Sequence, residues 1–165
     1  MPDLLRAFLR PDEIDQLQRL AEAARTWTPG RQGTGYDISS LTDLAPSSLG
    51  SRDAPPPSLD ALPPAIARAL AQLGTPYEQR WDAYLIRYRD GAYVPPHIDP
   101  AQHGRRHRRL NAMVVQAAGG GELRIGGALV ALEPGDAVVF YPDQEVHEVA
   151  PVAGTRLLLS VGALL

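Results

Sequence analysis

The stretch YVPPHIDP, residues 93–100, decides how the rest of this sequence is interpreted. Side chains alternate between the two faces of an extended strand, so His97 and Asp99 project from the same side. A neutral imidazole beside a carboxylate supplies two of the three protein ligands of a 2-His-1-carboxylate metal site, which holds Fe(II) and leaves further positions open. His-x-Asp alone arises often by chance, so the prediction depends on a third ligand elsewhere. His147 is the best candidate in this chain.

The composition of the chain excludes several kinds of functional site. The chain has 165 residues, which suits one domain with a proper core. It contains no cysteine, and all sixteen of its basic residues are arginine, so thiolate zinc sites, disulfides, Schiff-base lysines and P-loop lysines are excluded. The net charge of -3 gives no general attraction to nucleic acid or to a membrane surface, and neither partner is expected. The first residues lack the pattern of a secretory signal, which leads us to expect a cytoplasmic location.

The N-terminal part predicts helices and a loop. An apolar stripe with acidic residues in its first turn predicts a helix over residues 11–24. Residues 26–57 are rich in Gly, Pro, Ser and Asp and are interpreted as a long loop, with short strands possible at 25–28 and 36–38. A second helix is expected from a cap at Ser58 to Leu73, or from Pro63-Pro64 onward.

Beyond Gly74 the pattern changes to short apolar runs separated by Gly/Pro turns. We expect strands at residues 81–88, 110–116, 122–125, 129–132, 137–141, 145–150 and 155–161. Several short strands at close spacing predict a mainly β domain of the sandwich or barrel type.

Two residues near the C-terminus complete a candidate site. Pro151–Gly154 resembles a hairpin connection, and a turn centred between Pro151 and Val152 would place His147 opposite Arg156 on neighbouring strands. A metal ligand and a guanidinium would then lie roughly 5 Å apart on one face. A dicarboxylate that chelates the metal at one end could reach Arg156 with the other, because a guanidinium binds a carboxylate through two hydrogen bonds.

These motifs resemble the Fe(II)- and 2-oxoglutarate-dependent oxygenases, and within that superfamily the prolyl-4-hydroxylase-like branch. Residues 88–99 match that branch's Tyr…Gly…Tyr…His-x-Asp run, and residues 120–123 match its Gly-Gly turn. Residues 141–149, followed by Thr155-Arg156, match its final metal ligand and carboxylate anchor. The resemblance covers about the C-terminal half of the chain.

The resemblance implies a double-stranded β-helix (a jelly roll, cupin-like) with flanking N-terminal helices packed on one sheet. It implies one oxygenase domain over residues 1–165, with a helical buttress and loop in 1–75 and a jelly-roll core in 76–165. His97, Asp99 and His147 would hold Fe(II) and form the catalytic centre, and Arg156 would bind the C5 carboxylate of 2-oxoglutarate. O2 would be the oxidant, with ascorbate as an optional reductant.

The sequence departs from the branch at two positions. Branch members commonly carry a tyrosine on the strand before the Gly-Gly turn, whereas residues 109–116 contain none. Asn111 or Tyr88 could take its place as a second partner of the C5 carboxylate. The nucleic-acid dealkylating branch usually has a second arginine six residues after the first, and Gly162 stands there.

The substrate is the open part of the prediction. The resemblance implies hydroxylation of a C–H bond, in a prolyl or other amino-acid residue of a peptide or protein, or in a free amino acid or small metabolite. Tyr93 is a candidate pocket wall, and Arg109 (or Arg108) a candidate contact to a substrate carboxylate. His103 and His107 are interpreted as residues of a charged loop without a role as ligands.

Two other classes stay open at the sequence level. One is a cupin-type metalloenzyme that uses no 2-oxoglutarate and would not need Arg156. The other is a non-catalytic jelly roll that binds or senses a ligand, which retention of all three metal ligands disfavours. A further hypothesis is that part of residues 28–57 folds over the mouth of the metal site as a lid.

Overall fold

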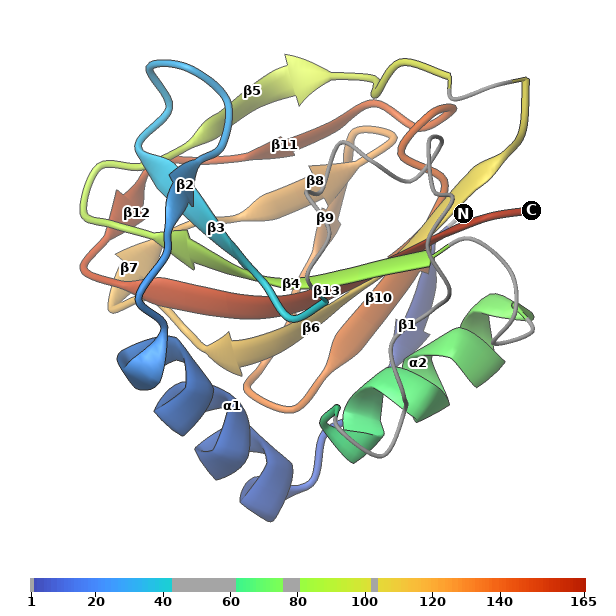
Figure 1. Ribbon diagram of the computed structural model, residues 1–165. Coiled ribbons are helices and arrows are strands. Elements are labelled where there is room, and N and C mark those ends of the chain that lie inside the picture. Colours follow the sequence, from blue (N-terminus) through green and yellow to red (C-terminus); the bar gives the residue numbers. More distant parts are fainter. Residues whose placement is uncertain (1, 43–61, 76–80, 102–103) are drawn as a thin grey trace.

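The computed structural model describes residues 2–42, 62–75, 81–101 and 104–165 (Figure 1). Its two helices are α1 (Pro11–Ala23) and α2 (Pro64–Leu73). Its strands are β1 (Asp3–Leu5), β2 (Thr28–Pro29), β3 (Tyr36–Ser40), β4 (Trp81–Tyr88), β5 (Val94–His97), β6 (His107–Val115), β7 (Gly119–Gly120), β8 (Leu123–Ile125), β9 (Ala128–Val130), β10 (Ala137–Phe140), β11 (His147–Val149), β12 (Val152–Ala153) and β13 (Arg156–Leu164).

The strands form two facing sheets and a short ribbon. The large sheet has the order β1-β10-β6-β13-β4-β3-β2, and the small sheet has the order β5-β11-β8-β9. The two-stranded ribbon β12-β7 lies where the chain passes from the small sheet to the large one (Figure 1). All pairings are antiparallel. This arrangement confirms the predicted mainly β fold of the double-stranded β-helix type.

Each face of the large sheet has its own hydrophobic core. Leu85 of β4, Leu110 of β6 and Leu159 of β13 pack with the helices, so α1 and α2 cover the outer face (Figure 1). Ile86, Met113 and Leu158 belong to a second cluster, which faces the small sheet. Because side chains alternate along a strand, Arg156 and Ser160 of β13 share the inner face with Leu158.

The N-terminal part contributes more strand than its sequence predicts. β1 joins one side of the large sheet and β2–β3 the other, so three strands of residues 1–75 belong to that sheet. Of the two short strands expected, the one at 36–38 is confirmed within β3, whereas the one at 25–28 is shifted, because β2 covers only Thr28–Pro29; Thr28 pairs with Ile38. The rest of the expected loop, residues 43–57, lies outside the described residues, and so does the Ser58 cap. Helix α2 begins at Pro64, the second of the two predicted starts.

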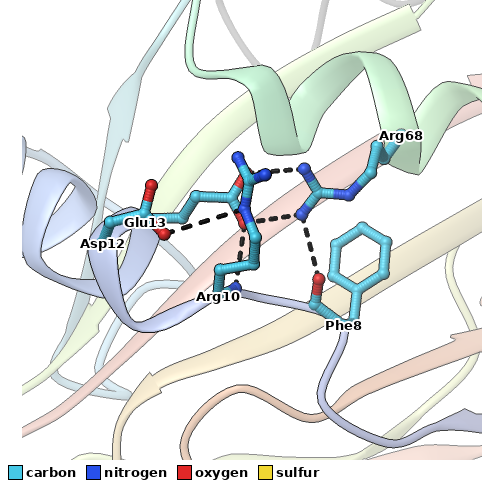
Figure 2. Close-up of polar contacts among 5 residues, drawn as sticks. All are labelled: Phe8, Arg10, Asp12, Glu13 and Arg68. Carbon is cyan, nitrogen blue, oxygen red and sulfur yellow. Dashed lines mark hydrogen bonds and ion pairs between the residues drawn. The ribbon is translucent and has the colours of Figure 1, made fainter.

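The two helices are joined by a buried ion pair at the start of α1 (Figure 2). Glu13 is only 2% exposed, and its two carboxylate oxygens each accept a 2.6 Å hydrogen bond from Arg68 of α2. The same carboxylate accepts the backbone N–H of Arg10 at 2.9 Å, and Arg68 also donates to the carbonyl of Phe8 at 2.9 Å. The Arg68 hydrogen bond is the largest influence that lowers the pKa of Glu13 below its ordinary 4.5. Glu13 therefore ties α1 to α2 on the outer face of the sheet.

Neither helix in the described part of the chain is long and apolar enough to cross a membrane.

We predict that Glu13→Gln lowers the free energy of unfolding by about 1–3 kcal/mol at neutral pH, because charge-assisted hydrogen bonds to Arg68 are lost. A carboxylate with a lowered folded-state pKa stabilises fully above its unfolded pKa of about 4.5 and loses this effect as the pH falls through the folded value. Urea unfolding at several pH values should show a constant difference between parent and variant above about pH 5, and a shrinking one below.

Asp12→Asn is the matched control, because Asp12 is exposed and makes only a 3.7 Å contact with Arg10. Its effect should stay within about 0.5 kcal/mol. A Glu13→Gln variant as stable as the parent, or a difference that persists unchanged to pH 3, would contradict the assignment.

Candidate functional site

Three side chains with metal-binding atoms meet on the small sheet. His97 and His147 are cross-strand neighbours on β5 and β11, and Asp99 follows β5 directly. The Asp99 carboxylate lies 3.2 Å from Nε2 of His97 and 3.9 Å from Nε2 of His147. Two ligand atoms about 2.1 Å from one metal ion can be at most roughly 4.2 Å apart, so both distances fit a shared ion. Among the described residues, this is the group of three that could hold a metal.

Backbone carbonyls fix the orientation of both imidazoles. Nδ1 of His97 is 2.9 Å from the carbonyl of Pro95, and Nδ1 of His147 is 3.0 Å from the carbonyl of Glu145. A carbonyl can only accept, so Nδ1 carries the proton and Nε2 presents its lone pair toward Asp99. Burial lowers the pKa of His147, which further favours the neutral form that binds metals.

The loop between β10 and β11 holds the rest of the site together. The Asp99 N–H donates to the carbonyl of Pro142 at 2.8 Å, and the N–H of Tyr141 donates to the Glu145 carboxylate at 2.8 Å. This loop also supplies the Glu145 carbonyl that orients His147. One short segment therefore positions two of the three ligands.

A cavity of about 870 Å³ separates the two sheets at this point, and the three ligands and Arg156 all line it. Arg156 is 1% exposed, and its Nε and Nη1 have no hydrogen-bond partner among the described residues. The nearest favourable group is the ring of Tyr88, 5.3 Å from the guanidinium carbon. Burial lowers the pKa of Arg156. A buried charge without a counter-charge is costly, so this geometry is suited to an anion that enters the cavity.

The predicted cross-strand pairing of His147 with Arg156 is wrong. β11 pairs with β5 and β8 in the small sheet, whereas β13 pairs with β4 and β6 in the large one. The connection does not turn back as a hairpin, because Val152 and Ala153 pair with Gly120 and Gly119 instead. His147 and Arg156 therefore face each other across the cavity from opposite sheets.

The ribbon that causes this crossing requires glycine. A Cβ on Gly120 would lie 2.1 Å from the carbonyl oxygen of Pro151, and the φ angle of Gly120 is +64°. Gly121 also has a positive φ, +71°, and a Cβ there would lie 3.2 Å from the Val152 side chain and 3.6 Å from Cδ of Arg156. The Gly-Gly turn thus allows the backbone to approach closely behind the guanidinium.

The two candidates for a second cosubstrate contact lie in different places. Tyr88 is the direct cross-strand neighbour of Arg156, and burial raises the pKa of its hydroxyl to about 12. Tyr36 of β3 stacks on the Tyr88 ring at 5.4 Å. Asn111 also lines the cavity but pairs with Ser160, four residues along β13 from Arg156.

The predicted substrate contacts are placed differently from expectation. Arg109 lines the cavity but is only 6% exposed, and it forms an ion pair with Asp82 at 3.4 Å. Tyr93 does not line the cavity; it is 40% exposed and directly precedes β5.

His107 is not in a loop, since it begins β6 and is buried, and burial lowers its pKa to about 3. His103 lies outside the described residues.

Sequence reasoning missed several residues of the cavity region. Asp82, Tyr84 and Ser160 all project from central strands toward the inside of the sandwich. Asp82 and Ser160 interrupt otherwise apolar strands, and such a polar residue in a buried run was the available signal. Short strands at 25–28 and 36–38 were expected within a long loop, and the structure shows that Thr28, Tyr36 and Ser40 of β2 and β3 line the cavity.

A sequence profile described as the 2OG-Fe(II) oxygenase superfamily matches residues 83–161 of this chain. That segment contains all three candidate ligands and Arg156. No curated protein sequence matches the chain.

Solved structures share the fold at low sequence identity. A prolyl-4-hydroxylase of Pseudomonas putida is similar with 21% identity and a TM-score of 0.70, over 99% of this chain and 91% of that one. A collagen prolyl hydroxylase of Paramecium Bursaria Chlorella virus-1, in complex with 2-oxoglutarate, has 15% identity and a TM-score of 0.63, over 99% and 94%. A prolyl hydroxylase of Trichoplax adhaerens, with a peptide fragment of hypoxia inducible factor, has 14% identity and a TM-score of 0.66, over 99% and 83%.

We predict that Asp99→Ala abolishes high-affinity binding of Mn(II) or Fe(II), because it removes the only carboxylate among the three converging ligands. Anaerobic calorimetric titration measures the effect. Glu148→Ala is the control, since Glu148 follows His147 on β11 but does not line the cavity. Metal affinity in Asp99→Ala equal to that of the parent would show that the ion binds elsewhere.

Proposed function

We propose that this chain is a 2-oxoglutarate-dependent dioxygenase of the 2OG-Fe(II) oxygenase superfamily, and that it hydroxylates a prolyl or other amino-acid residue within a peptide or protein. The observation that carries the proposal is the buried Arg156, which has no counter-charge among the described residues and lies across the cavity from the ligand group. A metalloenzyme that bound no anion there would gain nothing from that costly charge.

Under this proposal, His97, Asp99 and His147 would hold Fe(II), and the carbonyls of Pro95 and Glu145 orient the two imidazoles. When bound, the metal supplies open positions at which dioxygen is activated for oxidation of a C–H bond. The protein supplies the cavity and the orientation of the ligands. Ascorbate as a reductant is part of the proposal.

Arg156 binds the distal carboxylate of 2-oxoglutarate in this scheme, and Tyr88 is its partner. The two residues are cross-strand neighbours, so one carboxylate can reach both. With a pKa of about 12, the Tyr88 hydroxyl stays protonated at ordinary pH and can donate a hydrogen bond. Tyr88 therefore suits the role that the missing tyrosine on β6 has in the prolyl-4-hydroxylase-like branch.

The charges of the cavity favour a substrate that is uncharged where it reacts. Asp99, Arg109 and Arg156 are the carboxylate and guanidinium groups among its described lining residues. Asp99 is assigned to the metal, Arg156 to the cosubstrate, and Arg109 is compensated by Asp82. A free amino acid would bring an ammonium and a carboxylate without partners, whereas the same groups in a peptide are neutral amides.

With an uncharged substrate, neither Arg109 nor Tyr93 pairs with a charged group. Arg109 acts as a hydrogen-bond donor to an uncharged group, such as a peptide carbonyl. Tyr93 and Ile98 are both strongly exposed at the two ends of β5, the edge strand of the small sheet. A peptide that continues out of the cavity would meet this edge.

The test is succinate formation from 2-oxoglutarate with Fe(II), measured over a set of blocked peptides and the matching free amino acids. We expect stimulation by peptides with acetylated and amidated ends, and none by the free amino acids. Stimulation by a free amino acid alone would overturn the peptide proposal and favour a small-metabolite hydroxylase.

We predict that Arg156→Ala weakens 2-oxoglutarate binding by about 2–5 kcal/mol, because the distal carboxylate loses a buried charge partner. Calorimetry with Mn(II) present measures this loss, and the affinity for Mn(II) itself should hardly change. Arg124→Ala is the matched control, since Arg124 sits on the small sheet and does not line the cavity. Equal 2-oxoglutarate binding by Arg156→Ala and the parent would refute the assigned role.

A further inference from the structure

A chain of buried hydrogen bonds runs along the inner face of the large sheet, away from Arg156. The Arg109 guanidinium donates from Nη1 to Ser160 Oγ at 2.8 Å. Its Nη2 lies 3.4 Å from the Asp82 carboxylate and 3.1 Å from Nε2 of His107. Ser160 Oγ lies 2.7 Å from Oδ1 of Asn111. Asp82 also accepts the N–H of Gly162 at 3.1 Å, which fixes the carboxylate behind Arg109.

The structure places Oδ1 of Asn111 toward Ser160. A guanidinium can only donate, so Ser160 Oγ accepts from Arg109. Ser160 Oγ, which is also hydrogen-bonded to the Tyr84 hydroxyl, donates to Oδ1 of Asn111, and 2.7 Å is the usual length of an O–H···O hydrogen bond. Because Oδ1 of Asn111 faces Ser160, the amide nitrogen faces away from it. That nitrogen has no hydrogen-bond partner within the described residues, and Asn111 lines the cavity.

Asn111 lies at the metal end of the cavity. It pairs with Ser160, which is four residues from Arg156 on β13, or about 13 Å along the strand. A single carboxylate group is far shorter than that, so the carboxylate that Arg156 binds does not also reach Asn111. Phe140, the cross-strand neighbour of Arg109, contacts the His147 ring edge-on at 5.2 Å. Arg109 and Asn111, which project from the same face of β6, thus face the ligand group.

We infer that Asn111 donates hydrogen bonds from its amide nitrogen to the metal-proximal carboxylate of 2-oxoglutarate. Ser160, Arg109 and Asp82 are positioning residues that hold the amide in this orientation. The inference rests on the proposed function and extends it, because each end of the dicarboxylate then meets its own donor on the large sheet: Arg156 at the distal end and Asn111 at the proximal end. A neutral amide provides this contact without adding charge near the metal.

The experiment is a calorimetric titration of 2-oxoglutarate with Mn(II) present and no prime substrate. We expect Asn111→Ala to bind 2-oxoglutarate about tenfold to a hundredfold more weakly than the parent, the loss typical of a hydrogen bond to a charged group. Thr28→Ala is the control, since Thr28 also lines the cavity with a polar side chain but has no proposed cosubstrate contact. An affinity for Mn(II) equal to that of the parent shows that each variant is folded. If Asn111→Ala does not fold, Asn111→Ser is used in its place.

Ser160→Ala tests the positioning role, because it leaves Asn111 in place but frees its amide to rotate. We expect a smaller loss of 2-oxoglutarate affinity, about threefold to tenfold, and no additional loss when Ser160→Ala is combined with Asn111→Ala. Additive losses would show that Ser160 acts independently of Asn111 and would overturn the positioning role.

Unchanged 2-oxoglutarate affinity in Asn111→Ala would overturn the inference and assign the amide to the prime substrate. That outcome leaves the proposed function intact if Arg156→Ala still weakens binding. A parent chain that does not bind 2-oxoglutarate with Mn(II) present would instead refute the proposed function itself.

Discussion

A buried guanidinium without a protein counter-charge is the constraint on which this site depends. Arg156 is enclosed by β4, β13 and the Gly120-Gly121 turn beside the β12-β7 ribbon. No carboxylate among the described residues pairs with it. Burying an unpaired charge costs stability, which the rest of the fold must offset. The two helices and the hydrophobic core beneath the sheet provide that stability on the opposite face. The costly buried charge of Arg156 and the hydrophobic core that offsets its cost thus lie on opposite faces of the large sheet.

The two sheets divide the chemistry between them. The small sheet carries the metal ligands, oriented by backbone carbonyls whose positions follow from the β5–β11 register. The large sheet carries hydrogen-bonding side chains that line the cavity, from Arg156 at one end to Asn111 near the other. A dianion bound between the sheets would therefore be held by groups of both sheets. Neither sheet alone forms a complete site.

Local patterns in the sequence were sufficient for much of this architecture. The strand at residues 81–88 matches β4 in both bounds, and His-x-Asp in an extended segment predicted the shared face of His97 and Asp99 correctly. The partner of β13 was predicted wrongly, because a four-residue connection looks the same whether it closes a hairpin or crosses between sheets. The crossing is decided by the pairing of Val152 with Gly120, which is distant in the sequence. The same holds for the Arg109–Ser160–Asn111 chain, which spans two strands.

Under the proposed function, one dicarboxylate bridges the metal ligands and Arg156 across the cavity. A crystal structure of the chain grown with Mn(II) and 2-oxoglutarate would reveal this bridge. We expect Mn(II) between His97, Asp99 and His147, with the distal carboxylate on the Arg156 guanidinium and the Tyr88 hydroxyl. A 2-oxoglutarate molecule bound to the metal with its distal carboxylate elsewhere, and Arg156 turned to a protein carboxylate, would contradict it.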